Sequence, residues 1–276
     1  MRIIDTHLHL VYPERFSYPW LAGAPAIDQP WHVEDYAAEA APLGIEAALH
    51  MEVDVAEADI LPETGFMLDV HPLVHGAIAA CRPEQEGFEA FLDRIAALGP
   101  QVKGLRRVLH VVPDDLSATP LFEANLRLLA ARDLTFDLCV RTDQSAIACR
   151  LADAAPGVQF VLDHCLVPDI AGGDIAAWKA AIDAVARRPN VAVKISGVVA
   201  YSGPDWTTDT LRPWVEHTIG AFGWDRVVWG SDHPVCTLTA NLTRWVGAAQ
   251  ELVAGASGDE QAKLFHRNAE RIYRIS

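Results

Sequence analysis

The feature that most constrains the fold is an eightfold alternation of short apolar runs with longer amphipathic stretches. The runs are rich in β-branched residues and nearly continuous in hydrophobicity, as in strands that are buried on both faces. Strands that alternate with helices pair in parallel, so the pattern predicts an α/β fold with one parallel sheet. The predicted strands are residues 2–6, 45–53, 73–79, 102–108, 134–140, 158–163, 191–197 and 226–231.

The number of repeats favours a closed barrel. Eight strand–helix units in about 250 residues is the size of a (β/α)8 TIM barrel, and we expect residues 1–276 to form a single domain of this kind. An open doubly wound sheet is the alternative, but no Gly-x-Gly-x-x-Gly follows the first strand and there is no Walker-type loop. The predicted helices are residues 34–43, 83–98, 120–131, 144–153, 175–187, 209–222, 242–254 and 259–272.

The charge balance limits the partners of the chain. Its 22 Lys and Arg against 37 Asp and Glu give a net charge of −15, which disfavours nucleic acid and anionic membrane surfaces. No apolar run approaches the roughly 20 residues of a membrane span, and the N-terminus has no signal-peptide pattern. Five scattered cysteines without a Cys-x-x-Cys pair fit a reducing compartment. We therefore expect a cytoplasmic protein, and no sequence feature indicates its oligomeric state.

Polar residues gather where the predicted strands end. A (β/α)8 barrel carries its active site at the C-terminal ends of its strands, and buried polar groups are costly unless they are paired. We therefore expect one active site built from these ends. The candidates are His7, His9, His50, Glu52, His75, Arg106, His110, Asp137, Asp163, His164, Lys194, Ser196, Asp232 and His233.

His7 and His9 form the sharpest pair. Residues i and i+2 of a strand point to the same face, so the two imidazoles can bind one metal ion or one anionic group; polar core histidines are the alternative. Asp232, at the end of the last strand, faces the first strand across the barrel seam. It can ligate a metal or act as a general base toward water, or it can simply cap a helix or form a turn.

Two strand ends carry further candidates. His164 follows Asp163, and adjacent strand residues point to opposite faces. We favour His164 in the site, with Asp163 orienting a neighbour or contacting the outer helices. Lys194 can pair with a buried carboxylate or hold a substrate oxygen, and Ser196 shares its face.

Arg106 and Glu52 are a possible buried ion pair. Arg106 can instead hold an oxyanion, and Glu52 can instead ligate a metal, because zinc accepts both oxygen and nitrogen donors. Trp20 lies in a long connection after the first strand, which can cover a site or only anchor a buried loop. Weaker single candidates are His50, His75, His110 and Asp137.

These residues occur in motifs that resemble the amidohydrolase 2 branch of the amidohydrolase superfamily. Within this branch the chain is most similar to the sugar-lactone hydrolases, and hydrolases of 2-pyrone-4,6-dicarboxylate are a more distant match. The resemblance covers nearly the whole chain, down to residues 268–273. Its motifs are Asp5-Thr6-His7-Leu8-His9, Tyr18-Pro19-Trp20, Gly104-Leu105-Arg106, Asp163-His164-Cys165-Leu166-Val167-Pro168, Lys194-Ile195-Ser196-Gly197 and Gly230-Ser231-Asp232-His233-Pro234.

The resemblance implies hydrolysis of a sugar-acid (aldono) lactone by attack of water on the ester carbonyl. Asp232 is then the general base, and His164, Arg106 and Lys194 stabilise the developing oxyanion. The resemblance also allows a reaction without metal. Otherwise one divalent ion, zinc first, is expected on His7, His9, Glu52, His164 and Asp232. Substrate contacts are expected from Trp20, Glu52, His75, Ser196 and His233.

Three positions depart from the pattern of these lactonases. His233 stands in place of Trp, Glu52 in place of Gln, and His75-Gly76 in place of Gly-Trp. We expect all three at the pocket mouth, where they alter the substrate and leave the reaction class unchanged. Two other functions stay open. One is a metal-dependent non-oxidative decarboxylase of an aromatic or unsaturated acid, against which the Tyr-Pro-Trp and Lys-x-Ser-Gly motifs count, and the other is a non-catalytic sugar-acid binder.

Overall fold

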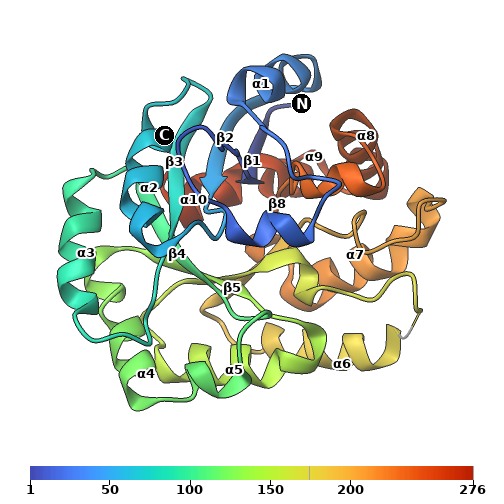
Figure 1. Ribbon diagram of the computed structural model, residues 1–276. Helices are drawn as coiled ribbons and strands as arrows, with labels where there is room; N and C mark the ends of the chain where they lie inside the picture. Colours follow the sequence, from blue (N-terminus) through green and yellow to red (C-terminus); the bar gives the residue numbers. More distant parts are fainter. Residues whose placement is uncertain (174, 276) are drawn as a thin grey trace.

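Eight parallel strands pair in chain order from β1 to β8 and form one sheet. The computed structural model describes residues 1–173 and 175–275. Figure 1 shows the strands in the middle of the molecule and the helices around them. The eight predicted strands are confirmed with small shifts of their ends: β1 Ile3–Leu8, β2 Ile45–Met51, β3 Val74–Ala80, β4 Val102–Val108, β5 Thr135–Cys139, β6 Phe160–Leu162, β7 Val191–Ile195 and β8 Val227–Trp229.

The sheet closes on itself between β8 and β1. Leu8 forms a parallel bridge with His233. The backbone N–H of Asp232 donates to the carbonyl of His7 at 2.9 Å, and the N–H of His9 donates to the carbonyl of His233 at 2.8 Å. The (β/α)8 barrel is therefore confirmed over the open sheet, and its closure brings the polar ends of the first and last strands together.

Helices cover the outside of the barrel. Apolar side chains between the strands and these helices form the larger core. Helix α2 contributes to this core, although no helix was predicted there. The sequence pattern hides α2 because Pro62 and Gly65 interrupt it, although Pro62 lies in the first turn, where its missing N–H has no helical partner to lose. The helices are α1 Val33–Ala40, α2 Ile60–Leu68, α3 Phe88–Ala97, α4 Pro120–Arg127, α5 Ser145–Ala154, α6 Ile175–Ala186, α7 Thr208–Phe222 and α8 Leu242–Leu252.

The C-terminal segment fills the inside of the barrel. The helix predicted at residues 259–272 is divided into α9 (Gly258–Ala262), one π-helical turn and α10 (Asn268–Tyr273). Ala269, Ile272 and Tyr273 join the apolar side chains that point inward from the strands, such as Leu49 and Val161. The interior is thus a packed apolar layer, and the polar residues at the strand ends lie beyond it.

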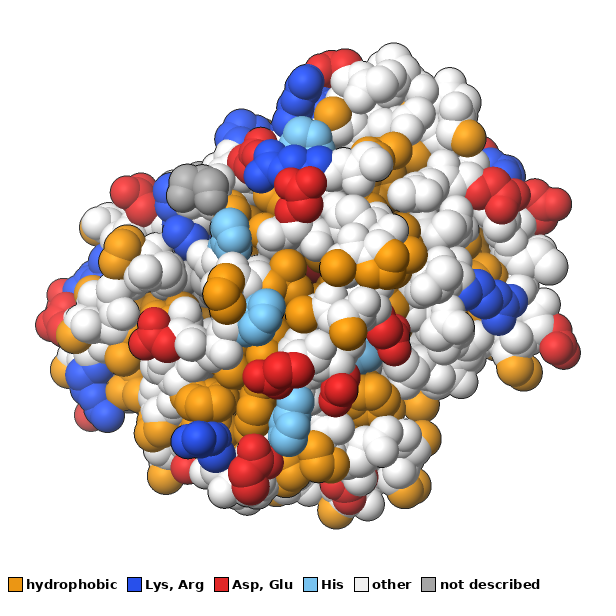
Figure 2. All heavy atoms as spheres, turned by 90° about the horizontal axis from the view of Figure 1, so that it is seen from above, with side chains coloured by type: hydrophobic (Ala, Val, Ile, Leu, Met, Phe, Trp, Pro, Cys, Tyr) orange, Lys and Arg blue, Asp and Glu red, His pale blue; other side chains and the backbone are white. Residues whose placement is uncertain are grey.

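The surface mixes charges of both signs. On the face drawn in Figure 2, acidic, basic and histidine side chains are dispersed among apolar and uncharged ones. Positive and negative side chains are therefore intermingled on this face.

No helix in the described parts of the chain has the length and hydrophobicity needed to cross a membrane.

Candidate active site

Three buried side chains converge where β1 meets the end of β8. The Nε2 atoms of His7 and His9 are 3.1 Å apart. Asp232 Oδ1 lies 3.8 Å from His7 Nε2 and 3.7 Å from His9 Nε2. Two ligands of a tetrahedral zinc ion, each at 2.0–2.1 Å from the metal, are about 3.3 Å apart. The spacing of these donor atoms therefore fits the edges of a coordination polyhedron.

The backs of both imidazole rings are held so that Nε2 faces this point. His9 Nδ1 lies 2.9 Å from the carbonyl oxygen of Met51, which can only accept a hydrogen bond, so Nδ1 is the donor. His7 Nδ1 lies 3.2 Å from the Lys194 ammonium and 3.5 Å from Asp163 Oδ1. An acceptor behind the ring, as at His9, fixes the tautomer of a metal-binding histidine. Burial lowers the pKa of His7 and of His9 well below the usual value, so both rings are neutral, as metal ligands must be.

Asp5 locks the two strand ends that carry these groups. Its Oδ1 accepts the backbone N–H of His7 at 3.0 Å and that of Ser231 at 2.8 Å. Its Oδ2 accepts the hydroxyl of Tyr36 from α1. The first residue of the Asp-x-His-x-His motif is therefore a structural clamp between β1, β8 and α1, a role that sequence reasoning did not assign.

Asp163 and His164 both point into the barrel, so the expected alternation between them is wrong. The strand β6 ends at Leu162, and the chain then turns tightly, with His164 and Cys165 at φ 51° and 50° in the left-handed region. Strand alternation no longer applies there. His164 lines the pocket as predicted, with its Nδ1 3.0 Å from Ser196 Oγ and 3.7 Å from Asp232 Oδ2. Asp163 orients His7 from behind, which was one of the alternatives.

Glu52 is the buried partner of Arg106. Arg106 Nε donates to Glu52 Oε1 at 2.6 Å, and Nη2 donates to the Glu52 carbonyl at 2.8 Å. The other carboxylate oxygen accepts the backbone N–H of Asp54 at 2.6 Å. Both oxygens are occupied, and Glu52 is in neither of the donor groups found among the described residues, so the structure does not place it as a metal ligand. Burial opposes the charge on Arg106, but Glu52 still holds its pKa above the usual value.

Lys194 lies below the pocket and does not line it. Its ammonium pairs with Asp137 and, at 3.2 Å, with Asp163 Oδ1. Burial raises the pKa of Asp137 to about 6, with the charge of Lys194 acting against this rise. Burial acts to raise the pKa of Asp163 as well, but Lys194 and His7 hold it well below its usual value. The oxyanion role expected for Lys194 is therefore replaced by the alternative of a buried ion pair.

The cluster carries more negative than positive charge. Glu52, Asp137, Asp163 and Asp232 are all buried here, and when ionised their four negative charges exceed by two the charges of the neighbouring cations, Arg106 and Lys194. Burial raises the pKa of Asp232 well above its usual value, and its Oδ2 makes no hydrogen bond to any described residue. A divalent cation beside Asp232 would balance this excess, so the donor set fits such an ion.

A pocket of about 300 Å³ opens over the cluster. His9, Arg106, His164 and Asp232 contribute its polar lining near the strand ends. Trp20 lines it as predicted, and its indole N–H donates to the carbonyl of Val53 at 2.6 Å. The other lining residues were missed in the sequence or left without a role. They end a strand or follow its end by a few positions: Val53, Asp54, Val108, His110, Val111, Cys139, Tyr201 and Val235.

Two predicted substrate contacts do not reach this pocket. His75 is the second residue of β3, at the N-terminal end of the barrel, whereas the pocket is at the C-terminal end. The chain turns after Asp232, whose φ is 57°, and His233 instead packs against the rings of Trp31 and Tyr36 at 5.1 and 5.2 Å. The expectation that both residues lie at the pocket mouth is therefore wrong. Ser196 is also fully buried and contacts His164, so it supports that ring from below.

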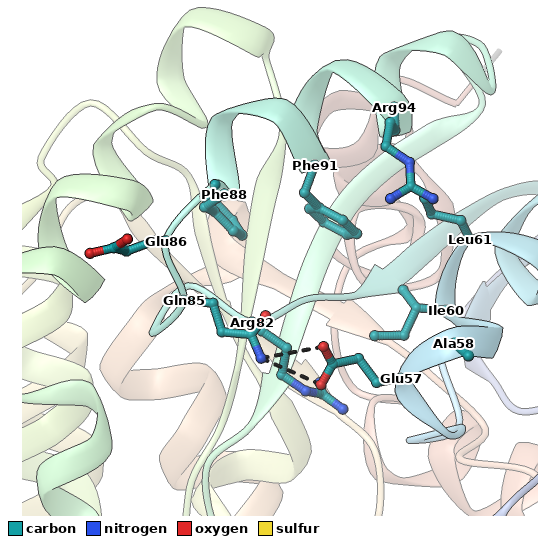
Figure 3. Close-up of a pocket in the computed structure, with 11 residues that line it drawn as sticks. Glu57, Ala58, Ile60, Leu61, Arg82, Gln85, Glu86, Phe88, Phe91 and Arg94 are labelled. Atoms are coloured by element: carbon teal, nitrogen blue, oxygen red, sulfur yellow. Dashed lines mark hydrogen bonds between the residues drawn. The ribbon is translucent and has the colours of Figure 1, made fainter.

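A second pocket, of about 460 Å³, lies between α2 and α3. Figure 3 shows Phe88 and Phe91 on one side of it and Glu57 hydrogen-bonded to Gln85 across it, with both bonds 3.4 Å long. None of the converging histidines or Asp232 lines this pocket. It is therefore separate from the candidate active site.

The sequence profile of the family described as Amidohydrolase matches residues 4–275. The chain belongs to the amidohydrolase family. This confirms the resemblance seen in its motifs. The chain is 25% identical over 99% of its length to an L-fucono-1,5-lactonase of Burkholderia multivorans, of which it covers 96%. It is 32% identical to an L-fucono-1,5-lactonase of Burkholderia ambifaria over 65% of this chain and 63% of that protein. The fold is similar to that of a Burkholderia multivorans amidohydrolase with bound zinc, with a TM-score of 0.90, 23% identity and full coverage of both chains.

Proposed function

We propose that the protein opens a lactone ring to the hydroxy acid, with the sugar-acid lactones as the first class to test. The observation that carries the proposal is the convergence of His7, His9 and Asp232 on the pocket floor beside Arg106 and His164. An ester carbonyl placed there meets a carboxylate base and a fixed cation at once. Similarity to proteins named as lactonases supports the same reaction.

His7, His9 and Asp232 would hold one divalent ion, and zinc suits two imidazoles with a carboxylate. A bound ion polarises a carbonyl and makes water more acidic. The similarity to a zinc-containing amidohydrolase structure agrees with this donor set. His9 is oriented for this task without the ion, because the carbonyl of Met51 accepts a hydrogen bond from its other ring nitrogen.

Asp232 is the base in this proposal. Its two oxygens have different surroundings: Oδ1 faces His7 and His9, while Oδ2 lies 3.7 Å from His164 Nδ1 without a hydrogen bond to the described residues. Burial raises the pKa of Asp232, which makes it a better proton acceptor than an exposed carboxylate. It takes the proton of the attacking water and returns one to the ring oxygen as the C–O bond breaks.

Arg106 and His164 stabilise the carbonyl oxygen as it gains charge. The Arg106 guanidinium is fixed by two bonds to Glu52 and lines the pocket, so its orientation costs nothing at the moment of reaction. Burial lowers the pKa of His164 to about 3, so its ring is neutral and can donate one hydrogen bond. Burial keeps Tyr201 protonated by raising its pKa, and its hydroxyl is a third donor in the pocket wall.

A proton-release assay tests the proposal. The panel contains L-fucono, L-rhamnono, D-galactono, D-xylono and L-arabinono lactones together with 2-pyrone-4,6-dicarboxylate. We expect ring opening of at least one of them, and a loss of roughly 10²- to 10⁴-fold in the Asp232→Asn variant. Asp69→Asn, an exposed aspartate at the end of α2, is the matched control and should keep full activity. Full activity of Asp232→Asn would place the base elsewhere.

A further inference from the structure

The polar groups at the strand ends occupy the floor of the pocket, and most side chains above them are apolar; Asp54, His110 and Tyr201 are the polar exceptions. On β4, Arg106 contributes to the floor and Val108 follows two residues later on the same face. A strand rises about 3.3 Å per residue, so Val108 lies about 6.6 Å further along β4 than Arg106, toward the mouth. Val111 then continues the wall in the loop after β4. β4 therefore places the Arg106 cation on the pocket floor and apolar side chains directly above it.

Other strand ends repeat this order. Val53 follows Glu52, Cys139 ends β5 two residues after the buried Asp137, and Val235 comes three residues after Asp232. A buried cysteine behaves as a small hydrophobic residue. Six apolar side chains line the space above the floor and share its wall with the three polar residues. We name them the apolar collar: Trp20, Val53, Val108, Val111, Cys139 and Val235.

The polar atoms in the collar are already paired. The indole N–H of Trp20 donates to the Val53 carbonyl. Cys139 Sγ lies 3.0 Å from His110 Nδ1. The collar thus offers little to the hydroxyl groups of a bound molecule, and each hydroxyl pressed against it would lose water without gaining a partner.

The collar is also exposed at the mouth. Val111 is 64% exposed and Trp20 38%, and both belong to the small group of large hydrophobic residues that the described chain leaves open to water. Scattered apolar residues on a surface need no explanation, but these two border the same pocket as the catalytic groups. An apolar part of the substrate, reaching out from the floor, would cover them.

We infer that the substrate is a monocyclic lactone whose ring carries a short alkyl substituent against the apolar collar, and not a lactone hydroxylated at every carbon. The inference rests on the proposed lactonase function and narrows its substrate class. The ester reaches Asp232 and Arg106 on the floor, and the substituent extends toward Val108 and Val111. The pocket of about 300 Å³ is at the small end of ligand sites, so the substituent is only a few carbons long.

The test compares kcat/KM for δ-valerolactone, δ-hexalactone, δ-octalactone and D-glucono-1,5-lactone in a pH-stat, after subtraction of uncatalysed opening. Burial of each added methylene against the collar should raise kcat/KM by about fourfold. We expect δ-octalactone to be the best substrate and D-glucono-1,5-lactone to be worse than unsubstituted δ-valerolactone.

Two variants locate the effect. Val108→Thr and Val111→Thr keep the side-chain shape but replace one methyl group with a hydroxyl. Each should lower the ratio of kcat/KM for δ-octalactone to that for δ-valerolactone several-fold. Because Val111 is exposed, the Val111→Thr variant should fold even if the Val108→Thr variant loses stability. Val70→Thr, in the loop between α2 and β3 at the other end of the barrel, is the matched control and should leave the ratio unchanged.

Three outcomes overturn the inference and can be told apart. A flat alkyl series or a preference for D-glucono-1,5-lactone refutes it and leaves the lactonase function intact. Unchanged ratios in both Thr variants show that the collar does not contact the substituent. Failure to open any of these lactones, and any of the sugar-acid lactones above, removes the proposed function itself and the inference with it.

Discussion

Replacing Glu52 by Gln tests whether this carboxylate is a partner of Arg106 or a metal ligand. The substitution keeps the size of the side chain and removes its charge. Arg106 Nε keeps an oxygen acceptor in place of Glu52 Oε1. The backbone N–H of Asp54, however, then faces an amide NH₂ in place of Oε2. The variant therefore leaves a buried cation without its main counter-charge and one buried donor without an acceptor.

The expected cost follows from the burial of the pair. The side chains of Arg106 and Glu52 are 6% and 1% exposed, and removing one partner of such a pair costs about 3–5 kcal/mol. The lower end applies here, because Arg106 keeps Asp163 at 3.5 Å and the Glu52 carbonyl at 2.8 Å. About 3 kcal/mol corresponds to a fall in Tm of roughly 6–12 °C for a protein of this size.

Urea and thermal denaturation measure this cost, with Glu84→Gln as the matched control. Glu84 pairs with Arg107, the neighbour of Arg106, at 2.8 Å, but this pair is 16% and 11% exposed, and we expect a loss of about 1 kcal/mol. Metal content by elemental analysis should be unchanged in both variants. A Glu52→Gln protein that lost its metal while keeping its stability would refute the assignment of Glu52 to Arg106.

Two further predictions concern the histidines. Mutation of both His7 and His9 to Ala should reduce bound metal to background in elemental analysis. The control variant His75→Ala, at the other end of the barrel, should retain its metal. Equal metal content in the two proteins would exclude His7 and His9 as ligands. Burial lowers the pKa of His233 to about 4. Between its usual pKa near 6.5 and pH 4, the unfolded chain binds a proton that the folded chain does not. Stability is therefore lost as the pH falls through this window, by up to about 1.4 kcal/mol per pH unit. The urea midpoint of His233→Gln should fall less steeply there, and parallel pH profiles would contradict this reasoning.

The strands were predictable because buried parallel strands are nearly continuous hydrophobic runs, and their alternation with helices leaves few topologies. The helix α2 was not, because Pro62 and Gly65 break its pattern and only its packing between β2 and β3 fixes it. In the site, His7, His9 and Asp232 could be placed together since i, i+2 spacing and barrel closure bring strand ends into contact.

Other parts of the site depend on tertiary contacts that have no periodic signal. His75 is an exception, because it is the third residue of the predicted run 73–79 and the second of β3, so its place at the N-terminal end of the barrel was already visible in the sequence. His164 itself has a positive φ and His233 follows Asp232, which has one, so the direction of neither side chain can be counted along a strand. Tyr201 comes from a loop after β7, and nothing in its local sequence marks it as part of the wall.

The central claim, attack of water on a lactone carbonyl, is tested most directly by ring opening in H₂¹⁸O with enzyme in excess over substrate. If Asp232 activates water, the hydroxy acid formed in the first turnover carries one ¹⁸O in its new carboxylate, as read by mass spectrometry. The Asp232→Asn variant should form this product far more slowly. A first-turnover product without ¹⁸O, or release of carbon dioxide in place of a ring-opened acid, would contradict the account.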